Sequence, residues 1–240
     1  MLKVLVIIQA RTGSQRLPKK VLKEIEGKTM LEHIVDFLKY CKKVDDIIVA
    51  TTTLKQDNQI ETICLKNKIK YFRGSSSNVL KRYYDCATHF KGDIIVRITA
   101  DNPLIDPNLV DKIIQTCKKT NCDYASNMIN QTYPFGYLVE AFTFNVLEKL
   151  HRQFHDLQSK EHVTFKIRQN PNSFHVEQVL APNHLRRPSW RLTVDHKEDF
   201  ELISQIFSKL YIVNSYIKYE KVVNLLDDDK KLLDINKKWH

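Results

Sequence analysis

The sequence has no apolar stretch that approaches the roughly 18 residues needed to cross a bilayer. Its opening residues also lack the apolar region and the small-residue cleavage site of a signal peptide. We therefore expect a cytoplasmic protein that does not bind membranes. A chain of 240 residues, of which 42% are hydrophobic and 28% charged, is typical of one globular domain with a large core.

Two further absences exclude common kinds of site. The five cysteines form an odd set without a CxxC pair, and no histidines have zinc-site spacing, so we expect reduced thiols without a chemical role. Neither the GxxxxGK[ST] loop of P-loop proteins nor the GxGxxG loop of dinucleotide-binding folds occurs. The main support for an ATPase or a dehydrogenase is therefore missing.

Acidic residues are outnumbered, and the formal net charge is +10. The lysines are spread mostly over predicted helix ends, where solvated helix surfaces explain them, and no aromatic RNA-binding signature accompanies them. We therefore expect no nucleic-acid partner. The excess charge suits the attraction of a triphosphate and of an acidic substrate toward a cleft.

The most informative segment follows the first apolar run, residues 4–8. The loop Gln9-Ala10-Arg11-Thr12-Gly13-Ser14-Gln15-Arg16-Leu17-Pro18-Lys19-Lys20 places the cations Arg11, Arg16 and Lys20 beside a glycine and two hydroxyls. We expect Gly13 to adopt backbone angles closed to other residues, and the cations to surround a polyphosphate. The alternative is a surface turn with scattered basic residues.

The hydrophobic pattern alternates between strand and helix periodicity. It predicts strands at 3–9, 46–52, 70–72, 93–99, 123–126, 138–143, 175–180 and 191–194. It predicts helices at 31–40, 58–66, 79–88, 108–118, 160–168 and 198–207. This order indicates an α/β three-layer sandwich with a mostly parallel, Rossmann-like sheet.

Polar side chains gather where the predicted strands end. Thr51 ends one strand, Asp101 follows another, and Asp195 follows the last. Because ligands of open α/β sheets bind beyond the carboxyl ends of the strands, we expect these groups to share one site. Two carboxylates completed by waters and substrate phosphate suit Mg²⁺, so we predict that Asp101 and Asp195 are metal ligands. The alternative for each is a helix cap.

Five ordered motifs over residues 3–205 resemble the sugar nucleotidyltransferases. The opening IIQARTGSQRLPKKVL is similar to the SpsF-type, spore-coat polysaccharide branch of the cytidylyltransferases, which resembles the CMP-Kdo and CMP-sialate (acylneuraminate) synthetases. The other family-like runs are FRGS with NVL and RY, VRITADNPLID, EHVT, and WRLTVD with ED, which begin at Phe72, Val96, Glu161 and Trp190.

The resemblance implies a nucleotide-diphospho-sugar transferase fold that transfers CMP from CTP to a sugar, an acidic sugar or another polar or phosphorylated acceptor. It implies a nucleotidyltransferase domain over residues 1–210, in which residues 120–185 form an acceptor lid and dimerisation arm of a homodimer. Residues 211–240 are expected to form a helical tail. Thr51, Ser75, Arg82 and Thr99 would line the nucleoside pocket, and a small pyrimidine pocket favours CTP.

From the residue inventory we assign catalysis to Arg11, Arg16, Lys20 and Asp101. Nucleotide binding is assigned to Gln9, Ala10, Arg11, Gly13, Ser14 and Lys20, beside the four nucleoside-pocket residues. Arg73 and Arg97 could instead be ion-pair partners within the scaffold.

The acceptor is less well specified by the sequence. The family resemblance favours Tyr137, Glu140, His162 and Arg191 as acceptor contacts, although His162 could equally be structural. Lys19 and Leu138 stand where relatives usually carry glycine and aspartate, and Ala100 stands where they usually carry glycine. A nucleotide-sugar-dependent glycosyltransferase and a catalytically silent paralogue therefore remain alternatives, although the Asp-x-Asp motif expected of the former is missing at Asp101.

Overall fold

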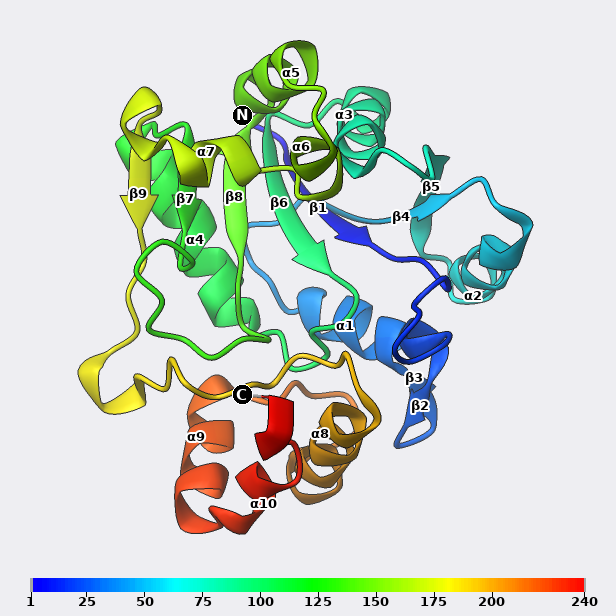
Figure 1. Cartoon of the computed structure of the whole chain (residues 1–240), viewed down its shortest axis with the longest axis vertical. Coiled ribbons are helices and arrows are strands. Elements are labelled where there is room, and N and C mark those ends of the chain that lie inside the picture. Colours follow the sequence, from blue (N-terminus) through cyan, green and yellow to red (C-terminus); the bar gives the residue numbers. More distant parts are fainter. Residues whose placement is uncertain (1, 240) are drawn as a thin grey trace.

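The computed structural model describes residues 2–239, which form a twisted sheet with helices on both faces (Figure 1). A separate group of helices, the helical lobe, lies below the sheet at the bottom of the view. The seven-stranded sheet found in this part of the chain has the order β5-β4-β1-β6-β8-β7-β9. Its strands are β1 Val4–Gln9, β4 Asp46–Thr52, β5 Lys70–Gly74, β6 Ile94–Thr99, β7 Tyr124–Ser126, β8 Glu140–Thr143 and β9 Val176–Gln178.

All neighbouring strands run parallel except at β8, which is antiparallel to both β6 and β7. β1 lies between β4 and β6, and its residues Val4 to Ile8 are fully buried. Val4, Val6 and Ile8 pack into one core and Leu5 and Ile7 into the other, because successive side chains of a strand point to opposite faces. A strand buried on both faces reads as a continuous apolar run, as this one does.

Helices cover the two faces of the sheet. The core on one face includes side chains of α1 Met30–Leu38, α2 Asn58–Lys66 and α4 Pro107–Thr120, and the other includes those of α3 Val79–Phe90, α5 Phe144–Gln153 and α7 Phe165–Gln169. α6 Leu157–Glu161 precedes α7, and a hairpin of β2 Glu24–Ile25 and β3 Lys28–Thr29 precedes α1. Short 3-10 turns lie at Lys20–Leu22, Lys55–Asp57, Pro171–Ser173, Asn183–Leu185 and Lys237–Trp239.

Local sequence explains several helix starts. Thr29 and Glu32 form a capping box at the start of α1, in which each side chain binds the other's backbone N–H. Asp106 caps α4, whose first residue is Pro107, a position where the missing N–H costs nothing. α1 thus begins directly after the hairpin, and α4 begins at the end of the loop that follows β6.

The helical lobe consists of α8 Lys197–Leu210, α9 Tyr219–Asp228 and α10 Lys231–Asp234. Val222, Val223 and Leu226 of α9 are buried in the same core as α1 and α4. Residues 211–239 therefore pack against the rest of the chain, whereas the proposed division at residue 210 and the lid at 120–185 stay predictions. Residue 240 lies outside the described residues.

The α/β class and the mostly parallel sheet are confirmed, with two local corrections. The predicted strand 191–194 is wrong, because that segment makes only an isolated bridge between Phe135 and Arg191. Asp195 therefore follows a loop segment and not a strand. The predicted helix 160–168 is two helices, α6 and α7, separated at His162–Thr164.

No helix within residues 2–239 combines the length and the apolar character needed to span a membrane.

Candidate functional site

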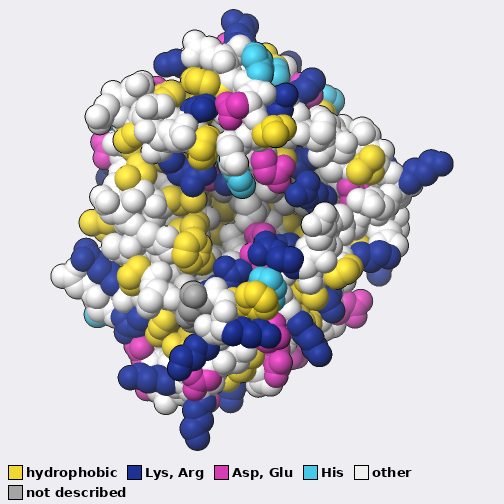
Figure 2. Space-filling view, in the orientation of Figure 1, with side chains coloured by type: hydrophobic (Ala, Val, Ile, Leu, Met, Phe, Trp, Pro, Cys, Tyr) yellow, Lys and Arg dark blue, Asp and Glu magenta, His cyan; other side chains and the backbone are white. Residues whose placement is uncertain are grey.

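A cleft opens at the carboxyl ends of β1 and β6. Its volume is about 710 Å³, and Figure 2 shows this face hollowed near its middle, with basic and histidine side chains around the hollow. The residues that line it come from the loop after β1, the end of β6, the end of α6 and the segment before α8: Gln9, Arg11, Gly13, Ser14, Gln15, Arg16, Lys20, Val21, Arg97, Thr99, Ala100, Asp101, Glu161, His162 and Asp195.

The loop after β1 is anchored by hydrogen bonds to the side chain of Asp57. This buried carboxylate accepts hydrogen bonds from the Thr12 backbone N–H (2.7 Å), the Thr12 hydroxyl (2.7 Å) and the Thr52 hydroxyl. The Ser14 N–H donates to the Thr12 carbonyl (2.9 Å). Thr12 therefore anchors the loop, and neither its hydroxyl nor the Ser14 amide is available to a phosphate in this arrangement.

Gly13 is required for a different reason from the one predicted. Its φ angle is not positive, so the expectation of backbone angles closed to other residues is wrong. A Cβ at this position would instead lie 2.8 Å from Nε2 of Gln56, so glycine serves the close approach of the two loops. The left-handed residue of the segment is Lys19, with φ +53°.

Lys20 lies at the centre of the cleft's charges. Its ammonium donates to Oδ2 of Asp101 (3.0 Å), Oδ1 of Asp195 (2.8 Å) and the Val194 carbonyl (2.8 Å). The two candidate metal ligands, 94 positions apart in the sequence, are thus held on one cation.

Asp195 has two further cationic partners. Arg16 lies 3.1 Å from Oδ1 and Arg191 lies 2.7 Å from Oδ2. Burial alone would raise the pKa of Asp195, but the hydrogen bonds and charges of Lys20, Arg191 and Arg16 outweigh it and hold the pKa below its usual value. Asp195 is therefore ionised at neutral pH, as a metal ligand must be.

The donor set fits a metal that also binds phosphate. Within residues 2–239 no group of three or more acidic, histidine or cysteine side chains is arranged to hold an ion. Mg²⁺ keeps several waters and commonly uses one or two carboxylates together with substrate phosphate. Asp101 and Asp195 match that pattern and do not match an all-protein cage.

The other side of the cleft is formed by the end of α6. Arg11 donates to Oε1 of Glu161 at 3.1 Å, and His162 follows Glu161 on the cleft wall. About half of the Arg11 side chain is exposed, so it can exchange this surface partner for an anionic ligand.

Three predicted nucleoside contacts lie behind the cleft. Thr51 is fully buried, and its hydroxyl has no hydrogen-bond partner. Arg82 is 1% exposed; its Nη1 donates to the Ser75 carbonyl (2.6 Å) and its Nε has no partner. Burial lowers the pKa of Arg82. Thr51, Ser75 and Arg82 are not brought to the cleft surface, whereas Gln9 and Thr99 line it and the buried Ala10 bonds to β4.

A second cavity of about 200 Å³ adjoins the first. It shares Arg97, Thr99 and Asp101 with the cleft, and its remaining wall consists of Asn102, Met128, Phe135, Gly136, Leu138, Glu140 and Thr193. A position where both cavities meet at Asp101 is suited to two reactants that must approach each other.

Glu140 lines the second cavity but is bonded to the scaffold. It accepts from Arg97 (2.5 Å), the Tyr124 hydroxyl (2.8 Å) and the Thr164 hydroxyl. Burial alone would raise the pKa of Glu140, but the charges of Arg97 and Arg168 and the hydrogen bonds from Thr164 and Tyr124 together outweigh it and hold the pKa below its usual value. The interpretation of Arg97 as an ion-pair partner is confirmed, and Arg73 likewise pairs with Glu61 at 2.5 Å.

The two remaining acceptor candidates lie outside both cavities. Tyr137 is fully buried, with its ring centroid 4.6 Å from that of Tyr219. Arg191 is bonded to Asp195 and Asp199. Direct contact with an acceptor is therefore not what the structure shows for these two side chains, because one packs in the core and the other supports the metal candidate.

Sequence reasoning missed the residues that support Asp195. Oδ2 of Asp199 accepts from the backbone N–H groups of Asp195 (3.0 Å) and His196 (2.9 Å). The His196 ring lies 3.5 Å from the Trp239 ring, in parallel, and its Nε2 is 3.5 Å from Arg16. The WRLTVD segment with the following acidic pair was the signal for Asp199; nothing local in the sequence indicated Trp239.

Residues 5–233 match a family model described as cytidylyltransferase. The chain is 40% identical over 235 residues to an uncharacterized protein of Methanocaldococcus jannaschii, with 98% of this chain and 95% of the relative covered. It is 37% identical over 211 residues to the spore coat polysaccharide biosynthesis protein SpsF of Bacillus subtilis, with 86% and 87% covered.

A solved cytidylyltransferase from Leptospira borgpetersenii superposes with a TM-score of 0.91 at 29% identity, covering 97% of each chain.

Proposed function

This chain belongs to the cytidylyltransferase family, and from that premise we propose that it transfers CMP from CTP to a sugar with release of pyrophosphate. One observation carries the proposal: Asp101 and Asp195 converge on the Lys20 ammonium at the mouth of a cleft that the arginines of the first loop also line. Nucleotidyl transfer needs mainly positioning and cations, and this cleft supplies both.

Donor binding is assigned to the first loop. Arg11 and Arg16 are exposed, Arg16 and Lys20 both contact the Asp195 carboxylate, and we assign these three cations to the β- and γ-phosphates. The Ser14 hydroxyl and the Gly13 backbone complete this wall.

Mg²⁺ is proposed as the metal, held by Asp101 and Asp195, where it would neutralise charge on the α-phosphate. Lys20 contacts both carboxylates in the structure, so a metal held by both would compete with its ammonium. The displaced ammonium would contact phosphate, and the same side chain would serve the carboxylates before the nucleotide binds and the phosphates afterwards. Arg191 retains Oδ2 of Asp195 and keeps that carboxylate oriented.

The nucleoside is assigned to Gln9, Ala10, Thr99 and the group behind the cleft, Thr51, Ser75 and Arg82. Support comes from the buried Thr51 hydroxyl and Arg82 Nε, for which residues 2–239 supply no hydrogen-bond partner. Buried polar groups are nearly always bonded, so a ligand that reaches them would gain affinity. Cytosine offers both donors and acceptors for such contacts.

The acceptor is assigned to the second cavity, with Glu140 in its wall, His162 on the wall of the adjoining cleft, and Tyr137 and Arg191 behind them. The shared residues Thr99 and Asp101 would bring an acceptor hydroxyl toward the α-phosphorus for in-line attack. The spore-coat relative supports a role in surface glycan synthesis.

The remaining parts of the proposal are a homodimer in the cytoplasm, with residues 120–185 as lid and arm. Exposed apolar side chains in this region, Ile129, Phe135 and Leu180, support a contact surface there.

The test is pyrophosphate release from CTP, UTP, ATP and GTP with Mg²⁺ and a pooled panel of sugars, sugar acids and phosphorylated acceptors. Release confined to CTP and one pool is expected, and Asp101→Asn should lose at least ~100-fold. Asp111→Asn is the matched control, because Asp111 only accepts from the backbone of Lys42 and Lys43. Silence with every pool together with no CTP binding by calorimetry would refute the proposal.

A further inference from the structure

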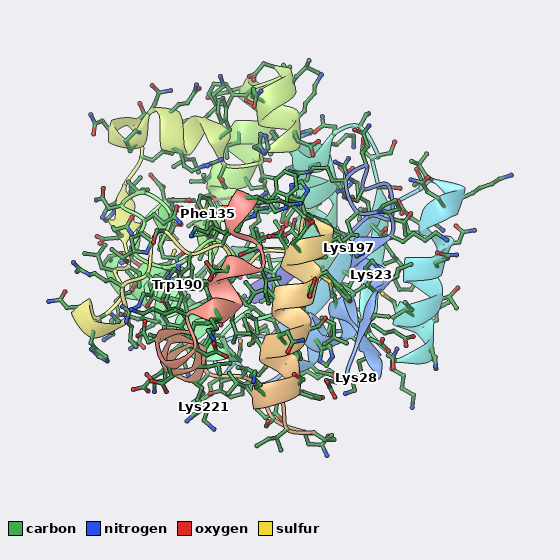
Figure 3. All side chains as sticks on the ribbon, turned by 60° about the horizontal axis from the view of Figure 1, so that its bottom comes forward. Lys23, Lys28, Phe135, Trp190, Lys197 and Lys221 are labelled. Carbon is green, nitrogen blue, oxygen red and sulfur yellow. The ribbon has the colours of Figure 1, made fainter. Side chains whose placement is uncertain are left out.

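The last described residues return to the cleft. After α9, the chain passes through α10 and a 3-10 turn, Lys237–Trp239, which packs against the start of α8. Figure 3 shows this C-terminal turn beside α8, whose first residue, Lys197, is labelled. The turn contacts residues that support the candidate donor site.

Asn236, the residue just before this turn, contacts the same group of supporting residues. Its side chain is fully buried, and Nδ2 donates both to the Arg191 carbonyl (2.9 Å) and to Oδ1 of Asp199 (2.9 Å). Arg191 and Asp199 are two of the residues that hold Asp195. One amide from the end of the chain therefore joins both of them.

Asp199 depends on its donors because its side chain is fully buried. It accepts from Nε of Arg191 (3.2 Å), from the backbone N–H groups of Asp195 and His196, and from Asn236. A buried carboxylate that loses a donor is destabilised or reorients toward those that remain. Either change would shift Arg191, whose Nη2 donates to Oδ2 of Asp195 at 2.7 Å.

The turn is also anchored around α8. Glu198 accepts from Lys238 (2.6 Å) and from the Trp239 indole (3.0 Å), and Trp239 stacks on His196. These contacts keep Asn236 in register with the segment that carries Asp195.

We propose that Asn236 is a positioning residue for the Asp195 carboxylate. The C-terminal segment 236–239 thereby contributes to the candidate donor site. The inference rests on the proposed function insofar as Asp195 binds the metal. Asn236 touches neither cavity, and its effect passes through Asp199 and Arg191.

The experiment compares Asn236→Ala with two controls in the full-length protein. Asn67→Ala removes a similar pair of bonds far from the cleft, since Nδ2 of Asn67 donates to one carboxylate (Glu32, 2.9 Å) and one carbonyl (Ile63, 3.0 Å). Leu232→Ala removes buried apolar contacts in the same tail. Mn²⁺ binding in the presence of CTP is followed by electron paramagnetic resonance.

Asn236→Ala should weaken Mn²⁺ binding roughly 10-fold, the scale expected when a group supporting a ligand is removed. Both controls should bind Mn²⁺ like the wild type, even though Leu232→Ala melts at a lower temperature. In an Asp195→Asn background the Asn236→Ala effect should nearly vanish, because the two residues act on the same ligand. Unchanged Mn²⁺ affinity in folded Asn236→Ala, or an undiminished effect in that background, would overturn the inference.

Hydrogen exchange provides a readout that does not depend on the proposed function. The Asp195 and His196 amides donate to Asp199, so exchange in the segment 191–199 should accelerate in Asn236→Ala while β6 exchanges as in the wild type. If the wild type failed to bind Mn²⁺ and CTP, the proposed function would be refuted, and the hydrogen-exchange experiment would still test the role of Asn236. Unaltered exchange at 191–199 in Asn236→Ala would refute that role.

Discussion

Replacement of Lys20 by methionine should make metal binding tighter while activity falls. In the structure the Lys20 ammonium occupies both candidate ligands, so a metal must displace it before it can bind. Methionine keeps the length of the side chain and removes the charge. The two carboxylates then lose the one cation that they share, while Arg16 and Arg191 remain on Asp195, so a metal that enters the variant no longer displaces the Lys20 ammonium.

The magnitude follows from the two bonds. A hydrogen bond to a charged group contributes about 1.5–3 kcal/mol. The side chains of Lys20, Asp195 and Asp101 are 12%, 19% and 27% exposed, so solvent screening reduces the sum. We take ~2–3 kcal/mol for the two Lys20–carboxylate bonds together. Since 1.4 kcal/mol corresponds to a tenfold change in a binding constant, metal affinity should be roughly 30- to 150-fold higher in the variant.

The assay is titration with Mn²⁺ in the absence of nucleotide, because Lys20 would contact phosphate when CTP is bound. Lys28→Met is the control: it removes the same charge from an ion pair with Asp36 (2.6 Å) outside the cleft and should leave Mn²⁺ affinity unchanged. Pyrophosphate release by Lys20→Met should fall by about 100-fold, the scale of losing one group that stabilises the transition state. Equal or weaker Mn²⁺ binding by Lys20→Met would refute the displacement argument.

Three other perturbations probe the same region. Without metal, the free energy of unfolding in urea should decrease as the pH is lowered from about 5 to about 3. The pKa of folded Asp195 lies below that of an unfolded aspartate, so the stabilisation is lost as the pH falls through the folded-state pKa. The free energy of unfolding of Asp195→Asn should decrease less over the same pH range. Glu140→Gln should cost about 3–5 kcal/mol in thermal unfolding by leaving the buried Arg97 unpaired, and a loss below about 1 kcal/mol, as for a surface pair, would contradict this. In Trp190→Phe, where Trp239 is the one remaining tryptophan of the chain, saturating CTP should change the emission spectrum, and an unaltered spectrum would argue against contact between the tail and the phosphate site.

Much of the fold could be predicted because its central strands carry an unambiguous pattern. The apolar run at residues 4–8 is buried on both faces, and such runs separated by amphipathic helices indicate a parallel sheet. The false strand at 191–194 has the same origin. Leu192 and Val194 are buried in alternation like strand residues, yet the segment pairs only at one bridge with Phe135.

The break in the predicted helix 160–168 depends on a distant residue. Thr164 is fully buried, and its hydroxyl donates to Glu140 of β8, which places the chain between α6 and α7 against the sheet. Periodicity alone carries no information about such a contact. The same limit applies to Gly13, whose small size is needed by Gln56 across the loop.

The centre of the site was predictable and its support was not. Lys20, Asp101 and Asp195 have residue types that suit a phosphate and metal site, and the structure brings them together, although Asp195 follows a loop segment and not the predicted strand. Asp199 supports Asp195 from four positions further along the chain, whereas Asn236 reaches this support from a segment that no local pattern connects to it. The family resemblance favours Tyr137 as an acceptor contact because of its neighbours in the sequence, but its side chain is buried in the core.

The bridge between Phe135 and Arg191 links the wall of the second cavity to the segment that leads to Asp195. The Phe135 N–H donates to the Trp190 carbonyl (3.1 Å), the Leu192 N–H donates to the Phe135 carbonyl (2.7 Å), and a Cβ on Gly136 would lie 2.4 Å from the Leu192 oxygen. These contacts couple the position of Phe135 to that of Asp195. Under the proposed function, an acceptor or an inhibitor that moves Phe135 would therefore also change the affinity for the metal, and acceptor recognition and metal binding would be energetically coupled.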